Sequence, residues 1–141
     1  MEIDSNNPVV RLCAAGIRAE MAGRLEEAVG VYQQAWDARA DDYDACIVAH
    51  YVARVQRTPS EALYWNQESL RRAEAVNDAR VEAFYPSLYL NLGKAHEDAG
   101  NKEEAKRFYG LAQEKAGVLP EGKYADTVRL GIAHGLERVS A

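Results

Sequence analysis

The sequence lacks any long apolar run, because nowhere do about 18 apolar residues stand together as a membrane-spanning helix requires. Its first eight residues, MEIDSNNP, contain neither a positive region nor an apolar stretch, so we expect no secretory signal peptide. A basic excess is also missing: 17 lysines and arginines stand against 22 acidic residues, for a net charge of −5. A nucleic-acid binder would show a basic surface. These absences predict a cytoplasmic protein that binds neither membrane nor nucleic acid.

Cysteine is scarce. Cys13 and Cys46 are the only two, and they stand 33 residues apart in apolar surroundings. A redox or metal pair more often occurs as C-x-x-C or beside histidines at ligand spacing. We therefore expect two reduced, half-buried thiols, with no metal and no cofactor.

Catalytic motifs are missing as well. The three histidines, His50, His96 and His134, fall on different expected helices, and no H-E-x-x-H spacing occurs. There is no G-x-S-x-G motif and no glycine-rich strand-to-helix turn for a nucleotide or methyl-donor cofactor. The sequence thus predicts a protein that is not an enzyme, and a small catalytic or regulatory site assembled across helices stays an alternative.

What the sequence does contain is a thirteen-residue pattern that occurs twice. GRLEEAVGVYQQA at 23–35 and GNKEEAKRFYGLA at 100–112 share Gly-x-x-Glu-Glu-Ala-x-x-x-Tyr-x-x-Ala. Apolar residues recur with a period of 3.6 throughout, and no alternating strand pattern occurs, so the chain is expected to be helical. Because one helical hairpin cannot bury its apolar face alone, a repeated hairpin predicts a stack of them.

Start and stop signals divide the chain into about seven helices. The run TPSE at 58–61 is a capping box with proline just inside the helix. Gly23 and Gly100 stand between helices, where a left-handed residue ends one helix and lets the chain turn. Pro86 should kink the fifth helix or split off a short first piece. The expected helices cover residues 8–22, 25–40, 43–57, 59–76, 79–99, 102–117 and 121–138.

Residues 89–112, YLNLGKAHEDAGNKEEAKRFYGLA, resemble the signature of the tetratricopeptide repeat, W-x₂-L-G-x₂-Y…A-x₃-F…P. Tyr89 stands in the tryptophan position, Leu92 and Gly93 form the Leu-Gly pair, and His96 takes the tyrosine position. A looser match covers residues 12–35. The middle repeat is degenerate.

The resemblance implies one tetratricopeptide domain over residues 1–141, in the all-α class, as a right-handed α-α superhelix (an α-solenoid) of helical hairpins. Ala28 and Ala62 are 34 residues apart, and Ala105 lies 43 further on, which leaves a nine-residue insertion. Gly131 and Gly135 should let the last helix press closely on the helix at 102–117. The repeats are expected at about 9–42, 43–76 and 86–119, with the insertion at 77–85 and a capping helix at 121–138.

By the same resemblance, the function is that of a non-catalytic helical-repeat scaffold that binds a protein, as a peptide or helical segment, in a concave groove. First helices would line it with Ile17, Glu20, Met21, Ile47, Tyr51, Arg54, Leu90, Asn91, Lys94, Glu97 and Asp98. The family's clamp for C-terminal carboxylates of chaperones is not expected, because only Asn91 has a clamp-like identity. The alternative is a structural self-assembly unit such as a homodimer, since the repeats leave both end faces lightly covered.

The middle repeat carries polar residues at three expected core positions. His50 takes the position of a glycine, Asn66 that of a tyrosine and Ser69 that of an alanine. In one interpretation the Asn66 amide reaches the His50 ring; in another the helix is rotated, so that Trp65 is the core aromatic and Asn66 faces water. A third makes His50 and Asn66 a polar recognition site on the groove. Either structural interpretation predicts a substantially buried Trp65.

Two other groups of residues allow more than one interpretation. Tyr32 and Tyr109 fall in the aromatic position of the repeat and are expected in the core. Arg71 and Arg72, together with Arg80, could form an anion site or could be solvated charges on helix surfaces.

Overall fold

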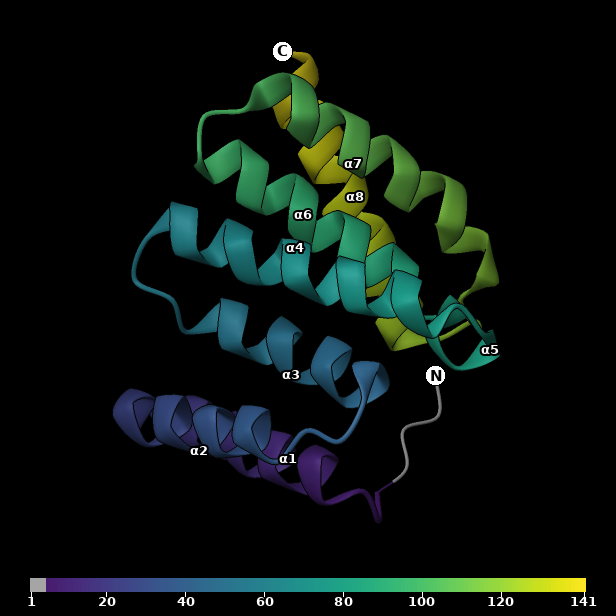
Figure 1. The fold of residues 1–141 in the computed structure, drawn as a ribbon. Helices are drawn as coiled ribbons and strands as arrows, with labels where there is room; N and C mark the ends of the chain where they lie inside the picture. The colour runs from purple at the N-terminus through teal and green to yellow at the C-terminus, as the bar shows by residue number, and fades with distance from the viewer. Residues whose placement is uncertain (1–4) are drawn as a thin grey trace. The chain divides into compact units, whose positions relative to one another are not determined.

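The structure is a computed structural model that describes residues 5–141; residues 1–4, part of the stretch from which no signal peptide is expected, lie outside the described residues. Eight α-helices and one 3₁₀ turn cover most of the described chain, which contains no strand. None of the described helices is both long enough and apolar enough to cross a membrane. The chain divides between Asn77 and Asp78 into two compact units, which Figure 1 shows in purple to teal and in green to yellow.

The N-terminal unit consists of two helical hairpins. The first pairs α1 (Pro8–Met21) with α2 (Leu25–Asp37), and the second pairs α3 (Asp42–Arg54) with α4 (Pro59–Val76). The expected capping box is present, since the Thr58 hydroxyl accepts a hydrogen bond from the Glu61 amide at 3.1 Å. The first and last residues of these four helices lie within three residues of the expected positions.

The repeated glycine and tyrosine positions explain the close packing of the first hairpin. Tyr32 is 1 % exposed, and its ring occupies the space that a Cβ at Gly16 would need. Ala28 and Ala35 on the same helix are fully buried. Only a residue without a side chain at Gly16 therefore allows the tyrosine to enter the core.

The C-terminal unit begins with the two pieces that Pro86 makes of one expected helix, α5 (Ala79–Glu82) and α6 (Tyr85–Asp98). Pro86 lies in the first turn of α6, where its missing amide proton costs no hydrogen bond. The unit continues with α7 (Lys102–Lys115), a 3₁₀ turn (Ala116–Val118) and α8 (Lys123–Ser140).

The last helix packs on both helices of the hairpin before it. A Cβ at Gly135 would lie 2.5 Å from the Tyr109 ring of α7, so the expected close approach to that helix is confirmed. A Cβ at Gly131 would instead lie 3.1 Å from Leu90 on α6. The core between these helices consists of Ala112, Ala116, Leu119, Ala125, Val128 and Ile132.

The turn after α2 holds the cap of the next helix, and α2 therefore ends earlier than expected. The expected helix 25–40 ends at Asp37, since the Asp41 carboxylate accepts the Asp44 amide at 2.9 Å and starts α3. Asp44 is itself 5 % exposed, and it accepts hydrogen bonds from the Ala40 amide at 2.9 Å and the Asn7 side chain at 2.8 Å. One carboxylate thus ties the start of α1 to the turn between the hairpins.

Candidate functional site

Six of the residues predicted to line the binding surface lie on α1 and α3, the first helices of the two hairpins in the N-terminal unit. On α1, Met21 is 84 % exposed and Ile17 is partly buried. On α3, Tyr51 is partly buried and Arg54 is exposed, whereas Ile47 is 6 % exposed and lies in the core. The accessible part of this set is therefore carried by residues near the C-terminal ends of α1 and α3.

Glu20 links this surface to the core. Its carboxylate accepts hydrogen bonds from the Tyr32 hydroxyl at 2.5 Å and from Arg54 Nη2 at 3.1 Å. Burial and the bond to Glu20 both raise the pKa of Tyr32. The Tyr51 ring stacks on Tyr32 with centroids 5.7 Å apart. Glu20 and Tyr51 are consequently held in fixed positions by the hairpin beneath them.

An equivalent arrangement occurs in the C-terminal unit. The Glu97 carboxylate accepts the Tyr109 hydroxyl at 2.7 Å and Arg138 Nε at 2.8 Å. The hydrogen bond from Arg138 is the main reason why the pKa of Glu97 lies below its ordinary value. Because Arg138 belongs to α8, the last helix takes the part in this contact that α3 takes in the N-terminal unit.

The other predicted residues of the C-terminal unit divide between the α8 interface and the surface. Leu90 packs against the core beneath α8. Lys94 and Asp98 are exposed and form an ion pair with a 2.8 Å separation, one turn apart on α6, and Asn91 is partly buried. Of the predicted residues in this unit, Lys94 and Asp98 are thus the accessible ones.

In the middle repeat the polar residues find partners close by. The Asn66 amide donates to the Ala62 carbonyl of its own helix at 2.9 Å, and the fully buried Ser69 hydroxyl donates to the Cys46 carbonyl at 2.8 Å. The His50 ring meets Tyr51 edge to face at 4.8 Å. Burial, reinforced by the Arg54 charge, lowers the pKa of His50 to about 4.

Trp65 supplies aromatic volume in the middle repeat, as expected. It is partly buried and meets Trp36 of α2 edge to face, with centroids 5.0 Å apart. Ser69, on the same helix as Trp65, stays fully buried. Trp65 therefore packs on the preceding hairpin and does not take the position of Ser69 in the core.

Both thiols are free and more deeply buried than the expected half. Cys13 is 2 % exposed and Cys46 is 1 % exposed. Burial raises the pKa of Cys13 to about 12 and that of Cys46 to about 11. Each therefore packs as a small apolar side chain. Within residues 5–141 no cluster of three histidine, cysteine or acidic side chains could hold a metal ion.

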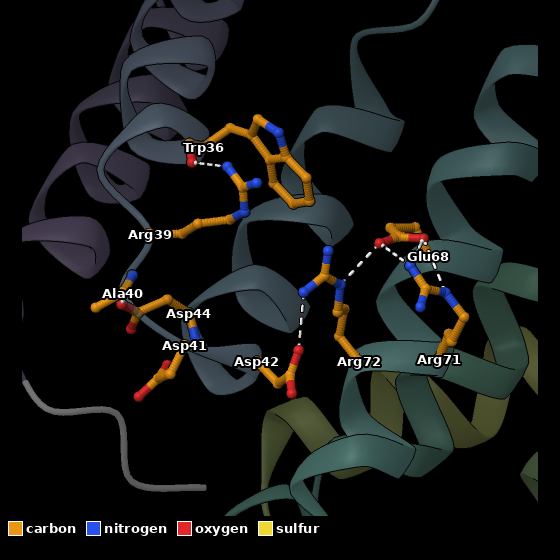
Figure 2. A network of polar contacts seen from close by, with 9 residues as sticks. All are labelled: Trp36, Arg39, Ala40, Asp41, Asp42, Asp44, Glu68, Arg71 and Arg72. Atoms are coloured by element: carbon orange, nitrogen blue, oxygen red, sulfur yellow. Dashed lines mark hydrogen bonds and ion pairs between the residues drawn. The ribbon is translucent and has the colours of Figure 1, made fainter.

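A polar network next to Trp36 joins α3 and α4 (Figure 2). Glu68, 8 % exposed, accepts hydrogen bonds from Arg71 Nη2 at 2.6 Å and Arg72 Nε at 2.8 Å. Burial opposes ionisation of Glu68, but the two arginines outweigh it and hold its pKa below the ordinary value. Arg72 also pairs with Asp42 at 2.8 Å.

In this network the Glu68 carboxylate is the anion that Arg71 and Arg72 bind, and it belongs to the chain itself. Arg71 and Arg72 share Glu68, and Arg80 pairs with Asp78 at 2.9 Å within the C-terminal unit. We did not anticipate Glu68 from the sequence, although its position three and four residues before the arginines is a spacing that favours helical ion pairs.

Comparison with known proteins shows the fold. No protein-family model and no curated protein sequence matches the chain. Among solved structures, the chain is similar to PcrH in its crystal structure in complex with the chaperone binding region of PopD. The sequences are 19 % identical, the TM-score is 0.65, and the match covers 96 % of this chain and 93 % of PcrH. The chain therefore has an all-α fold of the α-α superhelix class, built from helical hairpins.

Proposed function

We propose that this chain is a non-catalytic protein-binding module of the tetratricopeptide family that binds a peptide or helical segment through its first helices. The observation that carries the proposal is the likeness, over nearly the whole chain, to PcrH bound to a region of PopD. The Gly16–Tyr32 and Gly93–Tyr109 contacts support the family assignment, because both units use the same two repeat positions in the same way. We place the module in the cytoplasm, with a protein as its partner.

The exposed first-helix residues suit a peptide that carries both apolar and charged side chains. The N-terminal unit offers Met21, Tyr51 and Arg54, and the C-terminal unit offers Lys94 and Asp98. The hydrogen bonds that hold Glu20 and Glu97 limit the side-chain entropy that binding would cost. A site fixed in this way favours recognition over chemistry.

Affinity capture from native lysate tests the proposal. The double variant Tyr51→Ala, Lys94→Glu is compared with wild type and with a matched double variant on α7, Lys106→Glu, Gln113→Ala, whose residues are exposed. We expect the first variant to recover at least tenfold less of the main partner, and the α7 variant to recover it fully. If both variants retain the same partners, the first helices are not the binding surface.

Self-assembly is a second candidate, favoured by exposed apolar residues of the C-terminal unit. Val118 is 52 % exposed, Tyr124 46 % and Leu130 58 %. Sedimentation velocity over a hundredfold concentration range distinguishes the candidates. A monomer at every concentration excludes self-assembly, whereas a dimer that Leu130→Glu dissociates would support it.

A further inference from the structure

The outward side of α8, the yellow helix in Figure 1, is exposed along its length. The buried residues of this helix recur every three or four positions from Ala125 to Val139 and face the core of the C-terminal unit. On the opposite side, seven exposed residues lie within about 120° of the helix circumference, with the 58 % exposed Leu130 at their centre. We call these residues the α8 face: Lys123, Asp126, Thr127, Leu130, Ala133, His134 and Glu137.

The charged and titratable residues of the α8 face are placed symmetrically about Leu130, with opposite character on the two sides. Lys123 precedes Leu130 by seven residues, and Glu137 follows it by seven. Asp126 precedes it by four residues, and His134 follows it by four. Turning the helix end over end about Leu130 therefore brings each basic side chain to the place of an acidic one. A surface with this property is complementary to itself.

The side chains that carry this pattern are not used within the chain. Among residues 5–141, none of the four makes a hydrogen bond or an ion pair through its side chain. The two arginines beside the α8 face do have partners. Arg138 pairs with Glu97 at 2.8 Å, and Arg129 donates to the Ala116 carbonyl at 3.3 Å. The charges that a second molecule would meet on the α8 face are thus those of the symmetric pattern.

We propose that the α8 face binds the α8 face of a second copy of this chain, with the two helices antiparallel and a two-fold axis passing beside Leu130. In such a contact every pair of residues occurs twice, once on each side of the axis. Lys123 then faces the partner's Glu137, and Asp126 faces the partner's His134. Leu130 lies on the axis and packs against the partner's Leu130.

The same residues select the antiparallel direction. A parallel pair would place Lys123 against the partner's Lys123 and Glu137 against the partner's Glu137, and such opposed like charges disfavour association. Thr127 and Ala133 are small, so the helices can approach closely beside the leucines. The α8 face extends for about 21 Å along the helix, which makes a small interface. We therefore expect a weak, concentration-dependent dimer.

This proposal makes the second candidate function specific, because it names the helix, the direction and the register of self-assembly. It does not depend on binding through the first helices, since no residue of the α8 face belongs to the predicted groove. Affinity capture with the first-helix variants reports on that groove, whereas self-association of the purified chain reports on α8. Each proposal can consequently fail without the other.

Charge reversal tests the register. Sedimentation velocity of the purified full chain, at concentrations up to about 1 mM, measures the dimer. Lys123→Glu and Glu137→Lys each set like charges opposite one another at two symmetric places, so we expect each to weaken dimerisation at least tenfold. The double variant restores both ion pairs and should dimerise as wild type does. Lys106→Glu, at an exposed position of α7, makes the same change in net charge as Lys123→Glu and should leave the dimer intact.

A cross-link tests the position of the axis. The native thiols, Cys13 and Cys46, are 2 % and 1 % exposed and do not compete with an introduced one. In the Leu130→Cys variant the new thiols of two copies face each other across the axis. We expect mild oxidation to give a disulfide-linked dimer at least tenfold faster than in Met21→Cys, whose position on α1 is 84 % exposed.

Four results would overturn the proposal. One is a wild-type chain that stays monomeric over the whole concentration range. Another is a dimer that both single charge reversals leave unchanged. The third is a double variant that dimerises as weakly as the single ones although circular dichroism shows its helices intact. The last is equal rates of cross-linking in Leu130→Cys and Met21→Cys.

Discussion

Glycine residues within the helices differ in what surrounds them. The Tyr32 ring fills the space beside Gly16, whereas a Cβ at Gly30 would meet no atom within 4 Å. Both glycines lie inside helices, where glycine is about 1 kcal/mol less favourable than alanine. The packing therefore requires one of them and not the other.

We predict that Gly16→Ala lowers the free energy of unfolding by about 1–3 kcal/mol, because the new methyl group forces the Tyr32 ring out of place. Gly30→Ala should raise it by about 0.5–1 kcal/mol through helix propensity alone. Urea denaturation of the two variants and of wild type measures both changes. Equal effects of the two substitutions would show that the ring does not pack against Gly16.

His50 makes the stability depend on pH in a range above the titration of the carboxylates. Its pKa falls from 6.5 to about 4 because burial, and then the Arg54 charge, disfavour the imidazolium, while Glu20 acts in the opposite direction. Between these values the unfolded chain binds more protons than the folded one, so stability falls as the pH is lowered. Burial also lowers the pKa of His96, which adds to the effect.

We predict that wild type unfolds at lower urea concentration at pH 5.5 than at pH 7.5, and that His50→Gln reduces this difference. His134→Gln, at an exposed position of α8, is the control and should keep the full difference. A difference that survives unchanged in His50→Gln would mean that His50 is protonated in the folded protein.

At the scale of the helices, most helix starts, the hairpins and the core position of Tyr32 and Tyr109 could be predicted from the sequence, because caps and repeat positions are local signals. The arginines that bind Glu20 and Glu97 could not. Arg54 follows Glu20 by 34 residues and Arg138 follows Glu97 by 41, so no common spacing reveals them. The partner of Asn66 was equally undecided, because its own helix and the facing one both offer acceptors.

The contact between α2 and α4, which belong to successive hairpins, leads to a prediction about stability. Trp65 packs on Trp36, whereas its neighbour Tyr64 is 58 % exposed. We expect Trp65→Ala to lower the free energy of unfolding by about 2 kcal/mol, below the 3–5 kcal/mol of a fully buried tryptophan. Tyr64→Ala should change it by less than about 1 kcal/mol. Thermal unfolding measures both, and an unchanged melting temperature in Trp65→Ala would contradict the packing described here.

At the scale of the whole molecule, the fold and the fixed side chains of the first helices both bear on the proposed function. The likeness to PcrH spans 96 % of the chain, and each unit fixes a first-helix glutamate through a tyrosine and an arginine. The titratable groups are committed to packing and ion pairs: Glu68 and Glu97 are held ionised by arginines, and both thiols are kept protonated by burial. These features agree with the proposal that the chain binds a partner protein.

Site-specific photocrosslinking tests the central claim most directly. A photoreactive amino acid replaces Tyr51 in one variant, Lys94 in a second, and Gln113 of α7 in a third as the control. Each variant is irradiated in native lysate, and the adducts are resolved by mass. We predict that the variants at positions 51 and 94 give an adduct with the same protein and that the variant at 113 does not. An adduct at 113 with none at 51 or 94 would contradict binding through the first helices.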